Sequence, residues 1–223
     1  MSTGTRHTVT AFDDDMDEIR GLIAEMGARA ETAVIAAMKS LTEHNVELAA
    51  TTRAEDKIID NLETEVERLV VRTIALRAPM ADDLRELIAA LKMSAVIERI
   101  GDYAKNIAKR VPKMEGKIQI SAEDPLGRMG EIVVEMIRTA MDAYAKRDVD
   151  LARAVTVRDD VVDQLNKDLF VDFVAYVAKN PENATEVAHL LFTAKNLERI
   201  GDHTTTVAQM IYFTETGENL PDE

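Results

Sequence analysis

The segment Glu-Arg-Ile-Gly-Asp occurs twice in this chain, at Glu98–Asp102 and again 100 residues later at Glu198–Asp202. If each segment is helical, its Glu and Asp share one helix face, where two like charges repel by roughly 0.2–0.5 kcal/mol. The Gly inside each segment costs about 1 kcal/mol relative to Ala in a helix. Two matching sets of local penalties indicate an internally repeated fold with a functional segment in each repeat.

The residues around each segment repeat as three amphipathic helices. Apolar residues recur at helical spacing over about 12–41, 46–77 and 82–110, and again over about 125–144, 148–179 and 182–214. Pro79 and Asn180-Pro181 interrupt the two patterns at corresponding places. We predict an all-α fold of two tandem three-helix bundles, with six long antiparallel helices in an elongated rod. The first bundle is expected to span residues 1–112. A linker of residues 113–124 follows, and the second bundle spans residues 125–223.

Composition narrows the classes of function. The chain has 223 residues, a net charge of −14 and no Cys. The acidic balance argues against binding to nucleic-acid phosphates, and the lack of Cys excludes thiolate metal sites. No apolar run approaches the roughly 18 residues of a membrane span, and the N-terminus lacks a signal-peptide pattern. These features predict a soluble cytoplasmic protein that binds cations or docks on a basic partner.

The first hairpin brings four acids together. Asp60 and Glu98 each lie 19 residues from Pro79, and Asp56 and Asp102 each lie 23 residues from it. In an antiparallel hairpin with its apex at Pro79, Asp60 is therefore level with Glu98, and Asp56 is level with Asp102. Helical rotation also places Glu98, Asp102 and Asn106 on one stripe.

The second hairpin keeps the same register although it is three residues shorter. Asp163 and Glu198 have their midpoint between Asn180 and Pro181, and so do Asp159 and Asp202. Four carboxylates again meet at one height. At about 6 Å and an effective dielectric of 20, two carboxylates repel by ~3 kcal/mol. Either some of them hold protons or a cation lies among them.

Carboxylate and amide oxygens without Cys or His ligands suit Mg²⁺, Mn²⁺, Ca²⁺ or iron. Our candidate metal ligands are Asp56, Asp60, Glu98, Asp102, Asn106, Asp159, Asp163, Glu198 and Asp202. Asn166 and Phe170 stand where the first half has Glu63 and Glu67, so we expect the first cluster to bind metal more tightly.

Two other functions remain open. The acids could belong to ion pairs on a purely structural helical scaffold. They could also hold a metal that activates water in a phosphohydrolase, although no obvious Lys or Arg lies in line with the acidic face to hold a phosphoryl group. Neither a nucleotide-binding loop nor a catalytic His constellation is apparent, so we predict that the protein is not an enzyme.

The chain resembles the PhoU family, the accessory regulators of bacterial phosphate-specific transport, over nearly its whole length. The most specific matches are the two Glu-Arg-Ile-Gly-Asp segments, Asp56 with Asp60, Ala78-Pro79 followed by Asp83-Leu84-Arg85, and Leu197 through His203. The resemblance implies two three-helix bundles that often form a homodimer.

It also implies multinuclear metal clusters, here of Fe, Mn, Mg or Zn ions, on Glu98, Asp102, Glu198 and Asp202, with Asp56, Asp60, Asp159 and Asp163 as the facing acids. By this resemblance, the protein represses the phosphate-starvation response. Its implied partners are the ATPase of the phosphate importer and the membrane sensor kinase, so it meets the membrane only indirectly.

Overall fold

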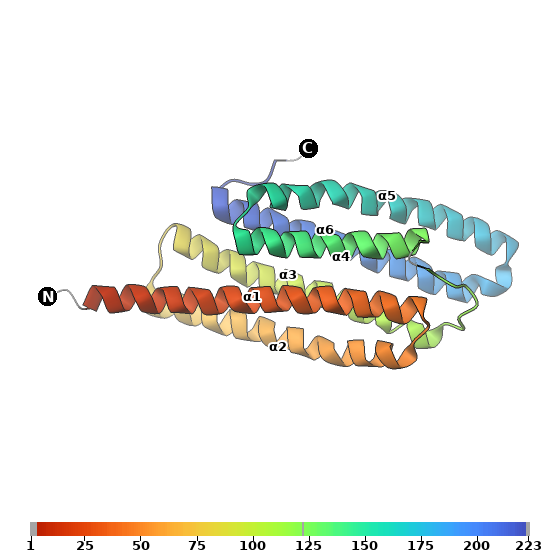
Figure 1. The fold of residues 1–223 in the computed structure, drawn as a ribbon, viewed down its shortest axis with the longest axis horizontal. Coiled ribbons are helices and arrows are strands. Elements are labelled where there is room, and N and C mark those ends of the chain that lie inside the picture. Colours follow the sequence, from red (N-terminus) through yellow and green to blue (C-terminus); the bar gives the residue numbers. More distant parts are fainter. Residues whose placement is uncertain (1–3, 122, 222–223) are drawn as a thin grey trace.

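Six long helices make up most of the part of the chain that the structure describes (Figure 1). The computed structural model describes residues 4–121 and 123–221, with side chains from residue 11 onward. The helices are α1 (Gly4–Thr42), α2 (Val46–Arg77), α3 (Asp82–Ala108), α4 (Pro125–Lys146), α5 (Val149–Lys179) and α6 (Ala184–Thr216). Two short 3-10 helices, η1 (Val111–Lys113) and η2 (Pro181–Asn183), precede α4 and α6. None of the described helices is long and apolar enough to cross a membrane.

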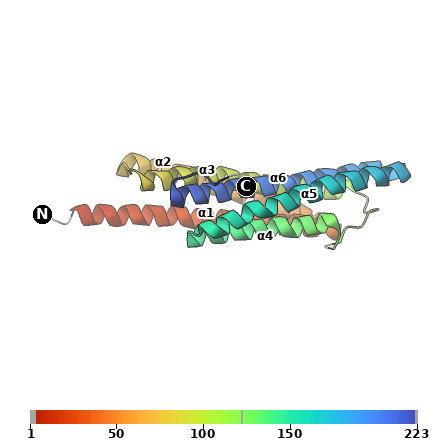
Figure 2. The ribbon, with the colours of Figure 1, turned by 90° about the horizontal axis from the view of Figure 1, so that it is seen from above.

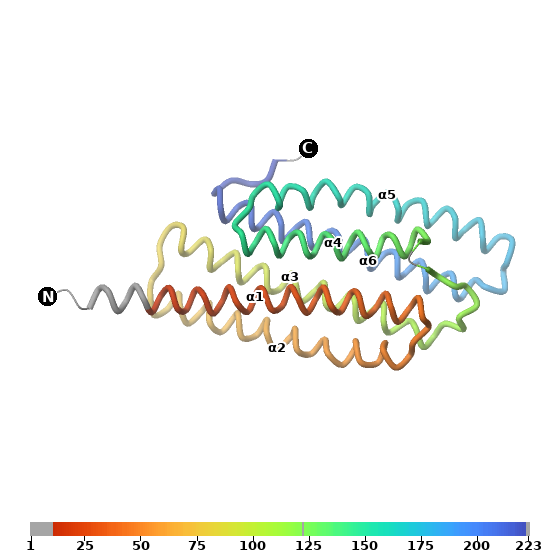
Figure 3. Tube along the Cα trace, in the orientation of Figure 1, coloured from red at the N-terminus to blue at the C-terminus, as the bar shows by residue number. Residues whose placement is uncertain are grey.

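The helices group into the two expected three-helix bundles. Helix α1 packs on α2 and α3, which pack on each other, and α4, α5 and α6 repeat this arrangement. The bundles lie side by side with all six helices roughly along the long axis, as two perpendicular views show (Figures 1 and 2). The chain crosses from one bundle to the other at one end of the molecule (Figure 3). The predicted all-α architecture is confirmed.

Local signals explain where several helices begin and end. The Asn45 side chain accepts a hydrogen bond from the Leu48 amide at 2.9 Å, and Asp148 accepts from the Asp150 and Leu151 amides. Ala78 takes a left-handed conformation with φ 46° at the end of α2, directly before Pro79. Asp124 is the N-cap residue of α4 but makes no side-chain cap hydrogen bond, because its carboxylate accepts hydrogen bonds from Ser121 on the preceding turn.

The bundles meet mainly through α3 and α6, with a second contact between α1 and α4. Ile97, Ile100 and Ile107 of α3 are buried, as are Ile200 and Val207 of α6. These residues lie on the side of each helix opposite the acidic stripe, as helical rotation predicts. The apolar seam therefore turns the two acidic stripes away from each other, toward α2 in one bundle and α5 in the other.

Candidate functional site

The first acidic cluster lies between α2 and α3 and contains its own cation. Asp56 is only 6% exposed. The Lys105 ammonium donates to Asp56 Oδ2 at 2.5 Å and to Asp102 Oδ1 at 3.1 Å. One amine between these two carboxylates confirms the register predicted from Pro79. The Lys105 ammonium also offsets part of the repulsion between carboxylates that the sequence predicts.

Glu98 is a strongly perturbed carboxyl group of this cluster. Burial, together with the negative charges of Asp102, Glu63 and Asp60, raises its pKa to about 7 against the opposing effect of Arg99. Arg99 Nε lies 3.8 Å from Glu98 Oε2. Near neutral pH, Glu98 is therefore partly protonated.

The remaining predicted ligands of this half lie at the edges of the cluster. Asp60 is half-buried on α2, one turn after Asp56, and adds to the potential at Glu98. Asn106 is exposed on α3, one turn beyond Asp102. Burial also raises the pKa of Glu63, which was not among the predicted ligands, and the negative charge of Asp60 adds to this effect.

The second acidic cluster lies between α5 and α6 and is neutralised differently. Burial, followed by the negative charge of Asp202, raises the pKa of Asp159 to about 6. Burial and Glu198 also raise the pKa of Asp202. Lys195 Nζ lies 2.5 Å from Glu198 Oε1, and Lys167 Nζ lies 4.0 Å from Asp163 Oδ2.

Two carboxylate oxygens of the second cluster have no hydrogen-bond partner within the described residues. They are Asp159 Oδ1 and Glu198 Oε2, both shielded from solvent. The position equivalent to Lys105 is Thr205, which cannot supply a positive charge. Unpaired buried carboxylate oxygens are costly, so this cluster is the more favourable of the two for an added cation.

The repeated glycines let the helices of each hairpin approach. A Cβ added at Gly101 would lie 2.9 Å from Ile59 Cδ1, and one added at Gly201 would lie 2.7 Å from Asp159 Oδ1. Any larger residue at either position would push the α2 or α5 side chain away. The glycines therefore hold Asp56 and Asp159 against the helices that carry the Glu-Arg-Ile-Gly-Asp segments.

The carboxylate oxygens of both clusters are the type of ligand that a hard cation prefers, but the side chains do not lie close enough together to surround one. In the described part of the chain, no three His, Cys, Asp or Glu side chains converge tightly enough to hold a metal ion. In the first cluster, a metal would have to displace Lys105 from Asp56 and Asp102. In the second cluster, the Thr205 side chain acts on the Asp159 carboxyl group and lowers its pKa, whereas Glu198 Oε2 has no hydrogen-bond partner in the described residues.

Two lysines on the acidic faces were not among the predicted site residues. No Lys or Arg was expected in line with the acids, yet Lys105 and Lys195 both lie there. Helical spacing could have indicated both ion pairs, because Lys105 follows Asp102 by three residues and Lys195 precedes Glu198 by three. Pairing with Asp56 across the hairpin depended on tertiary packing.

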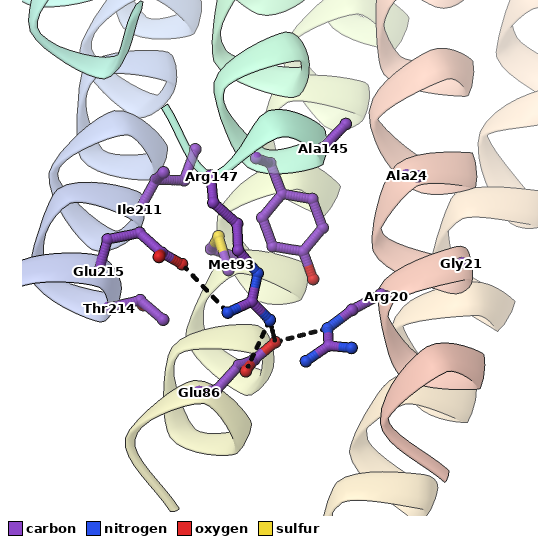
Figure 4. A pocket seen from close by; sticks show the side chains of 11 residues that line it. Arg20, Gly21, Ala24, Glu86, Met93, Ala145, Arg147, Ile211, Thr214 and Glu215 are labelled. Atoms are coloured by element: carbon purple, nitrogen blue, oxygen red, sulfur yellow. Dashed lines mark hydrogen bonds and ion pairs between the residues drawn. The ribbon is translucent and has the colours of Figure 1, made fainter. Parts of the chain in front are cut away.

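A separate pocket with several charged side chains lies between the two bundles (Figure 4). Glu86 of α3 accepts from Arg20 of α1 at 2.6 Å and from Arg147, which ends α4, at 3.2 Å. Arg147 also lies 3.8 Å from Glu215 of α6. The Tyr144 hydroxyl is buried here without a hydrogen-bond partner among the described residues. This network fixes the bundles at the end of the seam away from the linker.

Comparisons with known proteins match both halves. The family model described as the PhoU domain matches residues 23–111 and 126–211. A Zymomonas mobilis protein named phosphate-specific transport system accessory protein PhoU homolog is 48% identical over 216 residues, covering 97% of this chain and 91% of that protein. A Caulobacter vibrioides protein of the same name is 39% identical, covering 97% of this chain and 94% of that protein.

Solved structures agree with the sequence comparisons. The crystal structure of PhoU from Pseudomonas aeruginosa has a TM-score of 0.89 and 30% identity, covering 93% of this chain and all of that chain. The structure of the phosphate transport system regulatory protein PhoU from Streptococcus pneumoniae has a TM-score of 0.87 at 24% identity, covering 94% of this chain and 99% of that chain. The second likeness supports the fold alone.

Proposed function

This chain belongs to the PhoU family, and from that premise we propose that it is a non-enzymatic accessory protein of a phosphate-specific transport system. The observation that carries the proposal is the alignment with relatives bearing that name over nearly the full length of both chains. Because the similarity covers both halves of the chain, the proposed function is that of the whole chain and not of one three-helix bundle. The protein acts in the cytoplasm and represses the phosphate-starvation response.

The proposed partners are the importer's ATPase and the membrane sensor kinase. Support comes from the long helical faces of α2 and α5, which carry part of the net charge of −14. Complementary charge steers such encounters and favours correct partners. A homodimer is part of the proposal, since the family resemblance implies one.

Metal binding is the second part of the proposal. The donor set suits Fe, Mn, Mg or Zn, with Asp159, Asp163, Glu198 and Asp202 as the ligands of one site. The ligands of the other metal site are Asp56, Asp60, Glu98, Asp102 and Asn106. Because Lys105 already neutralises Asp56 and Asp102, we now place the tighter site in the second bundle, the reverse of the order that ligand counting suggested. A bound cation would replace the proton or lysine that limits repulsion among these acids.

A deletion strain carrying a reporter of phosphate-starvation genes tests the regulatory part. The reporter is expected to be active in phosphate-rich medium and to be silenced again by a plasmid copy of the protein. A reporter that stays silent after deletion would contradict repression. Hydrolysis of a generic phosphate ester that disappears in Glu98→Gln protein would favour the phosphohydrolase alternative instead.

Elemental analysis of protein purified without chelators tests the metal part separately. Glu198→Gln is expected to reduce bound metal more than Glu98→Gln does. Equal losses, or a larger loss from Glu98→Gln, would count against the assignment of the tighter site to the second bundle. Repression could persist in either case, so the two parts of the proposal fail independently.

A further inference from the structure

The internal repeat allows one surface of the second bundle to be compared with its equivalent in the first. Positions on α5 correspond to α2 with an offset of 103 residues, and positions on α6 correspond to α3 with an offset of 100. Phe170 and Phe192 are 59% and 56% exposed. Their equivalents are Glu67 and Lys92, so the fold does not require an apolar residue at either place.

The two phenylalanines line a shallow groove between α5 and α6. The groove has a volume of about 610 Å³, and Leu191 contributes to its apolar lining. Val171 and Val174 of α5 are 65% and 52% exposed nearby along the same helix. Several large apolar side chains exposed together on one face are typical of an interaction site rather than of an ordinary surface.

The edge of this groove carries a cation without an acidic partner. The Arg110 guanidinium lies over the Phe192 ring, 4.1 Å from its centroid, and its Nε is buried without a hydrogen-bond partner in the described residues. Its terminal nitrogen lies 3.5 Å from His189 Nδ1. Stacking on an aromatic face leaves the remaining donors of an arginine available for a carboxylate.

Other charges around Arg110 reinforce this local positive potential. Lys113 follows on η1 and, with Arg110, lowers the pKa of His189 after the larger effect of burial. No carboxylate of the described residues forms an ion pair with Arg110 or Lys113, although the chain is strongly acidic overall. Glu186 lies one turn before His189, but it accepts a hydrogen bond from the Ile118 amide at 3.2 Å instead.

We propose that the α5–α6 groove docks an acidic amphipathic segment of another protein. Its apolar side chains would lie between Phe170 and Phe192, and its carboxylates would pair with Arg110 and Lys113. An acidic partner is expected from charge complementarity, because Arg110 and Lys113 at the end of the groove form no ion pair within the described residues. The groove borders the second acidic face, because Lys167 and Lys195 line it and pair with Asp163 and Glu198. The proposed docking nevertheless requires neither metal binding nor a role in phosphate regulation.

Selection from a display library of short random peptides, with the full-length protein as bait, tests the proposal. Selected peptides are expected to combine helically spaced apolar residues with Asp or Glu. Their affinity is expected to fall by about tenfold or more in Phe170→Glu/Phe192→Lys protein, since central aromatic anchors dominate such interfaces. This double variant introduces the residues that the first half already carries, so folding is expected to survive, with helical circular dichroism as the check.

Val71→Glu is the matched control, because Val71 is 57% exposed on α2, outside the groove. It is expected to leave peptide binding unchanged, whereas Lys113→Glu should weaken binding and reduce its salt dependence. Selection of basic peptides, or binding unaffected by the double variant, would overturn the proposal. So would a change of sedimentation from dimer to monomer in the double variant, because the groove would then be an interface between copies of this chain.

Discussion

The rings of Tyr103 and His203 stack across the seam between the two bundles, with centroids 5.4 Å apart and an interplanar angle of 16°. These residues occupy equivalent positions in the repeat, each directly after the Asp of a Glu-Arg-Ile-Gly-Asp segment. The Arg199 guanidinium lies 5.7 Å from the centroid of the Tyr103 ring. The stack therefore joins the two segments at the centre of the molecule while their acids face opposite hairpins.

Protonation of His203 is expected to weaken this seam. Burial lowers its pKa below the ordinary value, and Arg99 and Arg199 add to the effect against Asp202. The unfolded chain therefore takes up the proton first as pH falls through about 6.5, and folding stability declines below that pH. Thermal unfolding between pH 7 and pH 5 should show a smaller decline for His203→Phe, which keeps an aromatic ring but cannot titrate. An equal decline of stability with pH in both proteins would show that the decline does not come from His203.

Removal of the Lys105 ammonium should destabilise the first bundle. Lys105→Met leaves the buried Asp56 without its cation, at an expected cost of about 1–3 kcal/mol in the free energy of unfolding at pH 7. The double variant Asp56→Asn/Lys105→Met should recover most of this loss, because no uncompensated charge remains. Lys109→Met, at an exposed position of the same helix end, serves as the control in denaturant titration.

Glu98 should make the protein less stable as pH rises. Its pKa in the folded state is about 7, above the ordinary value of 4.5, so the folded state holds the proton more tightly. Stability is greatest below pH 4.5 for this group and is lost as pH rises to about 7. With a chelator present, Glu98→Gln should therefore gain on the order of 1 kcal/mol over the original protein at pH 8, after allowance for solvent screening. No gain at pH 8 would contradict the raised pKa.

Two glycines of α1 should respond oppositely to alanine. A Cβ at Gly27 would overlap the Met141 side chain of α4, whereas a Cβ at Gly21 would meet nothing within 4 Å. Gly21→Ala should stabilise the protein by about 1 kcal/mol through helix propensity. Gly27→Ala should lose that gain and cost about 1–3 kcal/mol by forcing apart the contact between the bundles. Equal stabilisation by both, measured by thermal unfolding, would mean that Met141 moves aside freely.

Sequence alone determined the six helices and the level at which the acids meet. Periodicity, caps such as Asn45 and breaks such as Pro79 act locally, and a regular antiparallel hairpin converts equal distances from its apex into equal heights. Asp56 and Asp102 accordingly lie close together in the structure, where Lys105 binds both. The metal ligands themselves remain predictions, because spacing gives the donor types but not whether a metal replaces the protons and lysines.

Only the tertiary structure decided how the acids are neutralised. Lys105 and Lys195 each lie three residues from an acid on the same helix. Lys105 also reaches a second carboxylate across the hairpin, whereas no lysine of the described residues pairs with Asp159. The exposure of Phe170 and Phe192 and the stack of Tyr103 on His203 likewise depend on which helices meet. The physical reason is that periodicity fixes the face of a helix on which a side chain lies, whereas burial and partner atoms come from neighbours distant in the chain.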